Sequence, residues 1–144
     1  MNTEKNENRE GVTMLGNSKM GLPDAPQKDD LEAFENHFSH RDYTIKVDCP
    51  DFTSLCPVTG QPDFAHIKIQ YIPSQKCVEI KSLKLYLSAF RNTRAFNEEV
   101  VNKILDDLVD KIEPKSMTVT GEFSSRGGIS LTVTSTHPNP GTNL

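Results

Sequence analysis

Tryptophan is absent from the 144 residues, and cysteine occurs only at Cys49, Cys56 and Cys77. The cysteines form no Cys-x-x-Cys pair and their number is odd, which is typical of a reducing compartment, so we expect a cytoplasmic protein. No apolar run approaches the ~20 residues that a membrane-spanning helix needs, and no membrane partner is expected. The N-terminal residues are polar and charged, unlike those of a signal peptide.

Common binding motifs are also missing. No Gly-x-Gly-x-x-Gly follows a strand-like run, which excludes a Rossmann cofactor site, so side chains would have to hold any nucleotide. The formal net charge of -4 argues against a general nucleic-acid-binding protein, and no direct nucleic-acid partner is expected. His66 and the three cysteines match no standard zinc spacing, so we expect no metal site.

The length predicts one domain. Residues 1–30 contain few bulky apolar side chains and several glycines and prolines, so we interpret them as an extended or loosely ordered N-terminal arm. Residues 31–144 then form the single folded domain. A short helix is expected at its start, over residues 31–38.

Alternation of apolar and polar residues predicts the strands of this domain. Two prolines, Pro50 and Pro73, are expected to end the first two strands, because proline cannot donate to a strand ladder. The predicted strands cover residues 43–49, 65–72, 117–123 and 129–134, with a short extended segment at 77–80.

Apolar residues at helical spacing predict two helices between the second and third long strands. The first helix is expected to start near Lys81. The second is expected to have Asn97 as its N-cap and to continue through Ile112, before Pro114. The predicted order is therefore β-β-α-α-β-β, an α+β fold with an antiparallel sheet and two helices on one face. Four strands leave open sheet edges, so we expect an oligomer in which the edges associate into a larger barrel.

A loop rich in proline, glycine and hydroxyl residues surrounds Cys56, and Asp63 follows seven positions later. A thiol on a stiff loop is a candidate nucleophile, and a nearby acid is a candidate proton donor. The alternative is that Cys56 is a small buried hydrophobic residue and Asp63 a turn residue.

Charged residues of the two predicted helices allow two interpretations. Lys81 and Lys84 share a helical face that is either simply solvated or a phosphate-binding patch, with Arg91 and Arg126 as helpers. Glu98 either stabilises the start of its helix or accepts hydrogen bonds from a guanine-like ring.

Two motifs occur together in this chain. Residues 52–57 and 59–64 resemble the cysteine loop of the short NADPH-dependent 7-cyano-7-deazaguanine reductases, the nitrile reductases of queuosine biosynthesis. Residues 79–86 resemble the signature helix of that family. Further matches are residues 11–17, 90–92, Glu98 and 126–130, so that the resemblance runs from about residue 11 to 141.

The resemblance implies a tunnelling fold assembled into pentameric rings, or decamers of two rings, with active sites at subunit interfaces. It implies reduction of 7-cyano-7-deazaguanine to the 7-aminomethyl compound with two NADPH. By the same resemblance, Cys56 forms a covalent thioimide with the nitrile carbon and Asp63 donates the proton. The residues implied to hold the deazaguanine ring are Val78, Glu79, Ile80, Asn97 and Glu98. Those implied to bind NADPH are Lys81, Lys84, Arg126 and Gly127.

Two positions depart from the family pattern. The family usually has Ser or Leu at the position of Ile80 and His at the position of Asn97, and an asparagine cannot titrate. Two other functions remain open for a chain of this kind. One is a related amidinotransferase that captures a nitrile on tRNA with the same cysteine, and the other is a non-catalytic purine-binding member of the fold.

Overall fold

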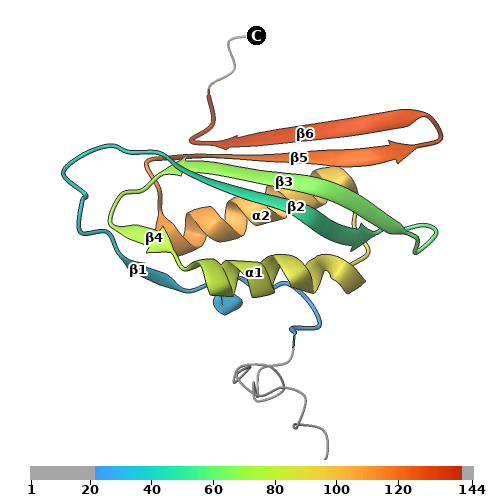
Figure 1. Ribbon diagram of the computed structural model, residues 1–144, viewed down its shortest axis with the longest axis horizontal. Coiled ribbons are helices and arrows are strands. Elements are labelled where there is room, and N and C mark those ends of the chain that lie inside the picture. The colour runs from blue at the N-terminus through green and yellow to red at the C-terminus, as the bar shows by residue number, and fades with distance from the viewer. Residues whose placement is uncertain (1–21, 141–144) are drawn as a thin grey trace, which may run out of the picture.

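The computed structural model describes residues 22–140. Figure 1 shows a sheet layer over a layer of helices. The elements in chain order are η3 (Lys28–Asp30), β1 (Ala33–Glu35), β2 (Ile45–Leu55), β3 (Pro62–Ile72), β4 (Lys76–Val78), α1 (Ile80–Ser88), η4 (Ala89–Asn92), α2 (Asn97–Ile112), β5 (Ser116–Arg126) and β6 (Ile129–His137).

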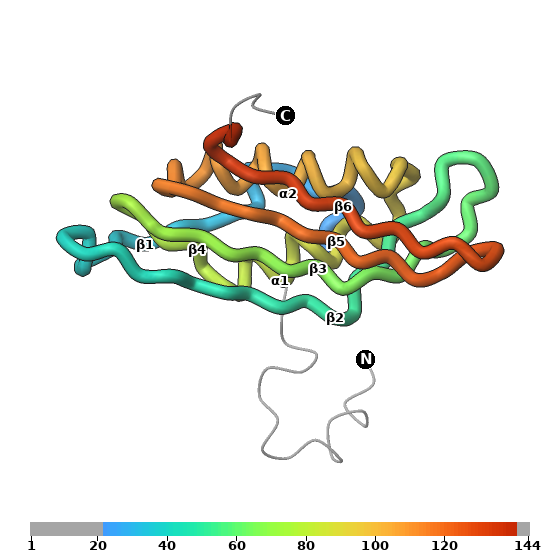
Figure 2. Tube along the Cα trace, turned by 90° about the horizontal axis from the view of Figure 1, so that it is seen from above, coloured from blue at the N-terminus to red at the C-terminus, as the bar shows by residue number. Residues whose placement is uncertain are grey.

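The main sheet is antiparallel in the order β2-β3-β5-β6. Both α1 and α2 lie against one face of it, as Figures 1 and 2 show from two directions. The predicted α+β class and the two helices on one face are confirmed. In the described chain, β2 and β6 form the two edges of this sheet, and neither has a partner strand on its outer side.

The alternation in β3 sets the position of the core. Ile67, Ile69 and Tyr71 are buried under the helices, whereas Lys68 and Gln70 are exposed on the opposite face. Helix α2 supplies the complementary apolar stripe, because residues at helical spacing all face the sheet. Its buried residues are Val100, Val101, Ile104, Leu105, Leu108 and Ile112.

The start of α2 differs by one residue from the prediction. Phe96, not Asn97, is the N-cap, and Asn97 is the first helical residue. Glu98 and Glu99 lie in the first turn, where their charge suits the helix dipole.

The helix predicted over residues 31–38 is wrong. Residues Ala33–Glu35 instead form β1, which pairs with β4 so that Phe34 lies opposite Cys77. The pairing satisfies backbone groups that an isolated short helix would leave to solvent, and it is reinforced where Asn36 N donates to Gln75 O at 2.9 Å.

Pro50 does not end the first predicted strand. β2 continues to Leu55, and the register of its pairing with β3 shifts between Cys49 and Phe52. A bulge absorbs the proline, and an edge strand tolerates its missing N–H because no neighbour needs that donor. The extra length puts Phe52–Leu55 in a strand, so the cysteine loop is shorter than predicted.

Residues 22–30, which the sequence assigns to the arm, contact the folded domain. Arg91 Nη1 donates to Pro23 O at 2.9 Å, and Pro26 is buried. The motif at residues 11–17 lies outside the described residues. Among the helices of residues 22–140, none has the length and apolar character needed to cross a membrane.

Candidate functional site

Cys56 begins the tight loop between β2 and β3. Its N–H donates to Gln61 O at 2.8 Å, and its carbonyl accepts from Gly60 N at 2.9 Å. Gly60 has φ 71°, a left-handed conformation that side chains other than glycine adopt at a cost. These contacts fix the backbone on both sides of the sulfur, so the thiol sits on a closed and stiff loop.

The surroundings of Cys56 favour its thiolate. The side chain is free and half-buried. The Thr59 hydroxyl is the largest cause that lowers its pKa, followed by the backbone N–H groups of Thr59 and Val58. Partial burial opposes this shift, and the charge of Arg126 supports it. A cysteine in such a setting is a better nucleophile at neutral pH than an ordinary thiol.

Asp63 lies at the start of β3 and is held by a cation. Its Oδ1 is 3.0 Å from Arg126 Nε, and Arg126 Nη2 donates to Pro62 O at 2.6 Å. The carboxylate side chain is only 13% exposed. The sequence assigned Arg126 to cofactor binding, whereas here two of its nitrogens bind the segment that carries Asp63. Gly127, also assigned to the cofactor, forms the β5–β6 turn with φ 56°.

The segment before α2 is tied to the cysteine strand. Leu55 N donates to Thr93 O at 2.9 Å, and Ala95 N donates to Leu55 O at 3.1 Å. The start of α2, with Asn97 and Glu98, therefore lies at the same end of the sheet as Cys56 (Figure 1). Four of the predicted site residues are thus brought together from separate elements, and they are Cys56, Asp63, Asn97 and Glu98.

Two buried polar atoms at this end lack a hydrogen-bond partner within residues 22–140. One is Asn97 Oδ1, and the other is Ser54 Oγ, whose residue lies directly opposite Asp63 in the β2–β3 register. Because an unpaired buried polar group costs free energy, these atoms are candidates to contact a bound ligand. The carboxylate-bearing residue Glu98 is exposed to solvent.

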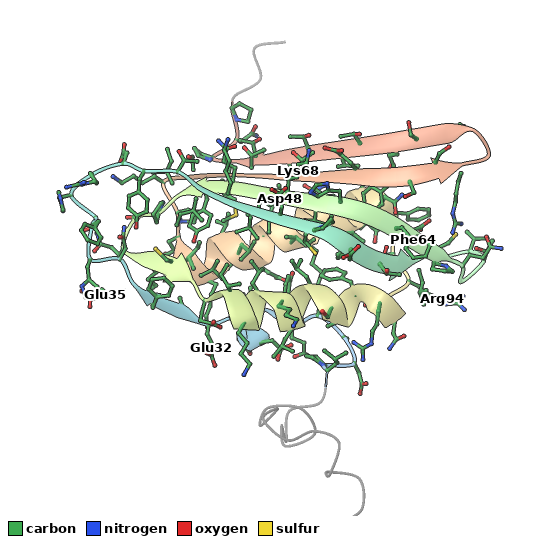
Figure 3. All side chains as sticks on the ribbon, in the orientation of Figure 1. Glu32, Glu35, Asp48, Phe64, Lys68 and Arg94 are labelled. Atoms are coloured by element: carbon green, nitrogen blue, oxygen red, sulfur yellow. The ribbon has the colours of Figure 1, made fainter. Side chains whose placement is uncertain are left out.

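Arg126 also lies at this end, whereas a second group of predicted site residues lies at the start of α1 and along it. The lengths of α1 and of η4, which follows it directly, add up to about 20 Å from the rise per residue of each helix type. Glu79 precedes the first helix and Thr93 follows the second. In Figure 3, Glu32, whose carbonyl accepts a hydrogen bond from Glu79 N at 2.8 Å, lies near β1, whereas Phe64 and Arg94 lie beside the β2–β3 loop. One copy of the chain therefore does not bring this second group to Cys56. The second group consists of Val78, Glu79, Ile80, Lys81 and Lys84.

Glu79 caps α1. Its two carboxylate oxygens accept hydrogen bonds from Lys81 N at 2.8 Å and from Ser82 N at 2.7 Å. These bonds, that from Ser82 first, lower the pKa of the Glu79 carboxyl. Ile80 and Lys81 are exposed beside it, whereas Val78 is buried in the core.

A groove of about 490 Å³ runs between α1 and the edge strand β2. Ile80 and Leu83 give it an apolar wall, and Lys84 and Arg91 place two cations along it. This size and mixture are common in small-molecule sites. Lys81 does not line the groove, and no group of three or more potential metal ligands gathers anywhere in residues 22–140.

Sequence reasoning missed two residues of the cysteine loop's surroundings. Thr59 belongs to the motif of the cysteine loop, but the sequence pattern assigns it no role in binding or catalysis. Arg94 was not singled out, yet its guanidinium lies so close to Gly60 that a Cβ there would be 2.6 Å from Nη2. Thr59 could have been identified from the sequence, because it is a hydroxyl residue three positions after a candidate nucleophile. Arg94 could not, because only the fold brings it to the loop.

Comparison with known proteins gives consistent results. The family profile described as QueF-like protein matches residues 62–142. The chain is 49% identical over 142 residues to the NADPH-dependent 7-cyano-7-deazaguanine reductase of Bacillus subtilis, covering 99% of this chain and 86% of that one. It is 51% identical over 129 residues to the reductase of the same name from Neisseria meningitidis, covering 90% of this chain and 82% of that one.

A solved structure shares the fold. The apo form of the archaeosine synthase QueF-Like superposes with a TM-score of 0.58 at 21% identity, covering 66% of this chain and 91% of that chain. At this identity the likeness concerns the architecture of the sheet and helices alone.

Proposed function

The chain belongs to the family of NADPH-dependent 7-cyano-7-deazaguanine reductases, and from this membership we propose how its own residues carry out the reaction. The protein is a nitrile reductase of queuosine biosynthesis that converts 7-cyano-7-deazaguanine to 7-aminomethyl-7-deazaguanine. The observation that carries this conclusion is the 49% identity to a curated reductase along 99% of the chain. The free cysteines support a cytoplasmic setting.

Cys56 opens the reaction as the nucleophile. Its thiolate attacks the nitrile carbon, a C–S bond forms, and one π pair of the C≡N bond moves to nitrogen, which takes a proton to give a thioimide. Asp63, ionised in its pair with Arg126, takes up the proton that the Cys56 thiol loses and passes it to this nitrogen. These roles of Cys56 and Asp63 are supported by the geometry of the loop, where the thiol lies on a fixed turn and Arg126 binds the carboxylate of Asp63.

The groove between α1 and β2 is the proposed NADPH site, because it carries two cations. Lys84 and Arg91 line the same cavity as Asp48 and Asp51, and the two cations are suited to contact the phosphates of a dinucleotide. NADPH when bound supplies hydride, and two equivalents are consumed because a nitrile takes up four electrons on the way to an amine. Lys81 lies one turn from Lys84 and adds positive charge outside the groove.

The deazaguanine ring is held from two sides in this proposal. The exposed carboxylate of Glu98 accepts hydrogen bonds from ring N–H groups, and Asn97 adds an amide beside it. Ile80 offers an exposed apolar contact, while Val78 contributes through its backbone because its side chain is buried. Glu79 keeps its capping hydrogen bonds from Lys81 N and Ser82 N, and the remaining lone pairs of its carboxylate accept hydrogen bonds from the ring.

A second copy of the chain completes the site. The group around Glu79 lies at the opposite end of α1 from Cys56, so contact between them needs two copies. The open edges of β2 and β6 are suited to join copies into a ring, and we expect a pentamer or a decamer of two rings.

A test of the reaction follows NADPH absorbance after mixing the protein with the nitrile. Oxidation that is absent in Cys56→Ala supports the proposal, and a product with the mass of the amine separates it from the amidine of a transferase. Unchanged NADPH would contradict it.

The shared site has a separate test. Cys56→Ala and the double variant Lys81→Ala/Lys84→Ala are each expected to be inactive. Mixed after dissociation and reassembly, they regain part of the activity if the two groups come from different copies. Mixtures that stay inactive, although native mass spectrometry shows mixed rings, would contradict a shared site.

A further inference from the structure

We propose that Tyr86 is a positioning residue for NADPH, because its hydroxyl ties α1, which forms one wall of the groove, to α2. The inference rests on the proposed function, since it takes the groove between α1 and β2 as the NADPH site. Tyr86 belongs to the helix motif of residues 79–86, but it lies outside both groups of predicted site residues.

Tyr86 does not face the groove. Its side chain is fully buried, and it is not among the residues that line the groove. The neighbouring positions Leu83, Lys84 and Leu87 do line it. Tyr86 therefore has no surface to offer a molecule in the groove, and it acts on such a molecule only by setting where α1 lies.

The hydroxyl of Tyr86 bonds α1 to α2. It donates to Asp107 Oδ2 at 2.6 Å, and Lys103 Nζ, one turn earlier on α2, lies 3.0 Å from the same oxygen. Within residues 22–140, this is the one side-chain hydrogen bond between the two helices. The Asp107 side chain is only 14% exposed, so loss of the donor leaves a carboxylate with little water to replace it.

Burial is the first cause that raises the pKa of Tyr86, and the bond to Asp107 is the second. The phenol therefore keeps its proton and stays the donor of this bond. Helix α2 is a fixed reference for it, because six residues of α2 are buried against the sheet side of the fold. A hydrogen bond from α1 to this helix thus limits how far α1 can shift.

Two aromatic contacts lead from Tyr86 to the opposite wall of the groove. Tyr86 packs edge-on against Phe90, with ring centroids 5.5 Å apart, and Phe90 packs against Phe52 at 5.4 Å. Phe52 belongs to β2 and lines the groove. The hydroxyl held by α2 and the ring packed toward β2 together set the distance between α1 and β2, and hence the width of the groove.

The test measures NADPH binding without the nitrile, through the fluorescence of the reduced nicotinamide. Tyr86→Phe keeps the ring contacts and removes the hydroxyl. We expect the Kd for NADPH to rise roughly three- to tenfold, because a hydrogen bond to a charged group that holds the groove wall is lost. Hydrogen–deuterium exchange of the protein without NADPH should show faster exchange in α1, and unchanged exchange in β3.

Tyr43→Phe is the matched control. It also removes a tyrosine hydroxyl that donates at 2.6 Å, in this case to Asn36 Oδ1, but this contact lies outside α1 and α2. It should leave the Kd for NADPH unchanged. Asp107→Ala and the double variant Tyr86→Phe/Asp107→Ala complete a double-mutant cycle, in which the losses of affinity should not add because both changes break one contact. Circular dichroism checks that each variant is folded.

The proposal is overturned if Tyr86→Phe binds NADPH as tightly as the wild type or leaves the exchange of α1 unchanged. It is also overturned if Tyr43→Phe loses as much affinity, or if the losses in the cycle add fully. Weaker binding in Tyr86→Phe and Asp107→Ala that does not add and spares Tyr43→Phe supports it.

Formation of the adduct between Cys56 and the nitrile, measured without NADPH, tests the proposed function separately. If the wild type forms no adduct although Tyr86 controls NADPH binding, the proposed reaction fails and the role of Tyr86 stands. If the adduct forms and Tyr86→Phe binds NADPH normally, only the role of Tyr86 fails.

Discussion

Arg126 Nε lies 3.0 Å from Asp63 Oδ1, so the end of β5 holds the acid at the start of β3. A second bond, from Arg126 Nη2 to Pro62 O, fixes the neighbouring backbone. The arginine therefore orients the proposed proton donor and also places a positive charge near the nucleophile.

Replacing Arg126 by glutamine should release Asp63 and remove one cause of the low pKa of Cys56. We expect kcat to fall roughly ten- to hundredfold, since small displacements of a catalytic group have effects of this size. The pH profile of kcat/KM should also move to higher pH. Lys28→Gln, which removes the cation of an exposed ion pair with Asp110, is the control. A rise in KM for NADPH with kcat unchanged would instead support the cofactor role that the sequence suggested for Arg126.

The cysteines of β2 and its loop should titrate in opposite directions. Hydrogen bonds, that of Thr59 first, lower the pKa of Cys56, whereas burial raises the pKa of Cys49. At pH 7 Cys56 should therefore be alkylated roughly ten times faster than Cys49 or more, and its labelling should decline as the pH falls through its own pKa. Peptide mapping after timed labelling of the native protein measures both rates in one sample. Equal rates would show that the loop does not activate Cys56.

Gly60→Ala should disturb the cysteine loop. The left-handed φ of 71° costs a residue with Cβ about 1–2 kcal/mol, and the new methyl would also displace the Arg94 guanidinium. We expect lower stability in denaturant and slower alkylation of Cys56. Gly128→Ala is a matched control, because its φ is 80° but no atom lies within 4 Å of the added Cβ. It should lose stability without changing the reactivity of Cys56, and an equal loss of reactivity in both variants would contradict the account.

Glu79→Gln should weaken the cap of α1 in a pH-dependent manner. The fold lowers the pKa of this carboxyl, so its stabilising contribution is present above the ordinary carboxyl pKa and is lost as the pH falls through the lowered value. We therefore expect Tm to fall by about 3 °C at pH 7 and by progressively less as the pH falls through the lowered pKa, because the wild-type carboxyl then becomes protonated as well. Thermal unfolding of both proteins across a series of acidic pH values measures this. A Tm difference that stays the same over the whole series would show that the charge of Glu79 does not stabilise the helix.

The sequence was most informative where the local pattern and the fold agree. The alternation of β3 and the apolar stripe of α2 are periodic over many residues, and both were predicted with their buried faces. Predictions failed where a distant segment decides the local structure. Within residues 31–38, Ala33–Glu35 form a strand because β4 lies beside them, and β2 continues past Pro50 because a bulge on an open edge accommodates it.

The candidate site shows the same division. The cysteine loop and the helix motif could be found from their residue types and their resemblance to a family. The ion pair between Arg126 and Asp63 could not, because it joins residues of two strands whose pairing is set by the sheet. The sequence also could not show that Glu79 lies at the start of α1, whereas Cys56 of the same copy lies near the opposite end of this helix.

The most direct test of the central claim is the mass of the intact protein after mixing with 7-cyano-7-deazaguanine in the absence of NADPH. The account predicts an increase equal to the mass of one nitrile molecule per chain, located on the peptide that contains Cys56 and absent from Cys56→Ala. An unchanged mass, or an adduct that persists in Cys56→Ala, would contradict it.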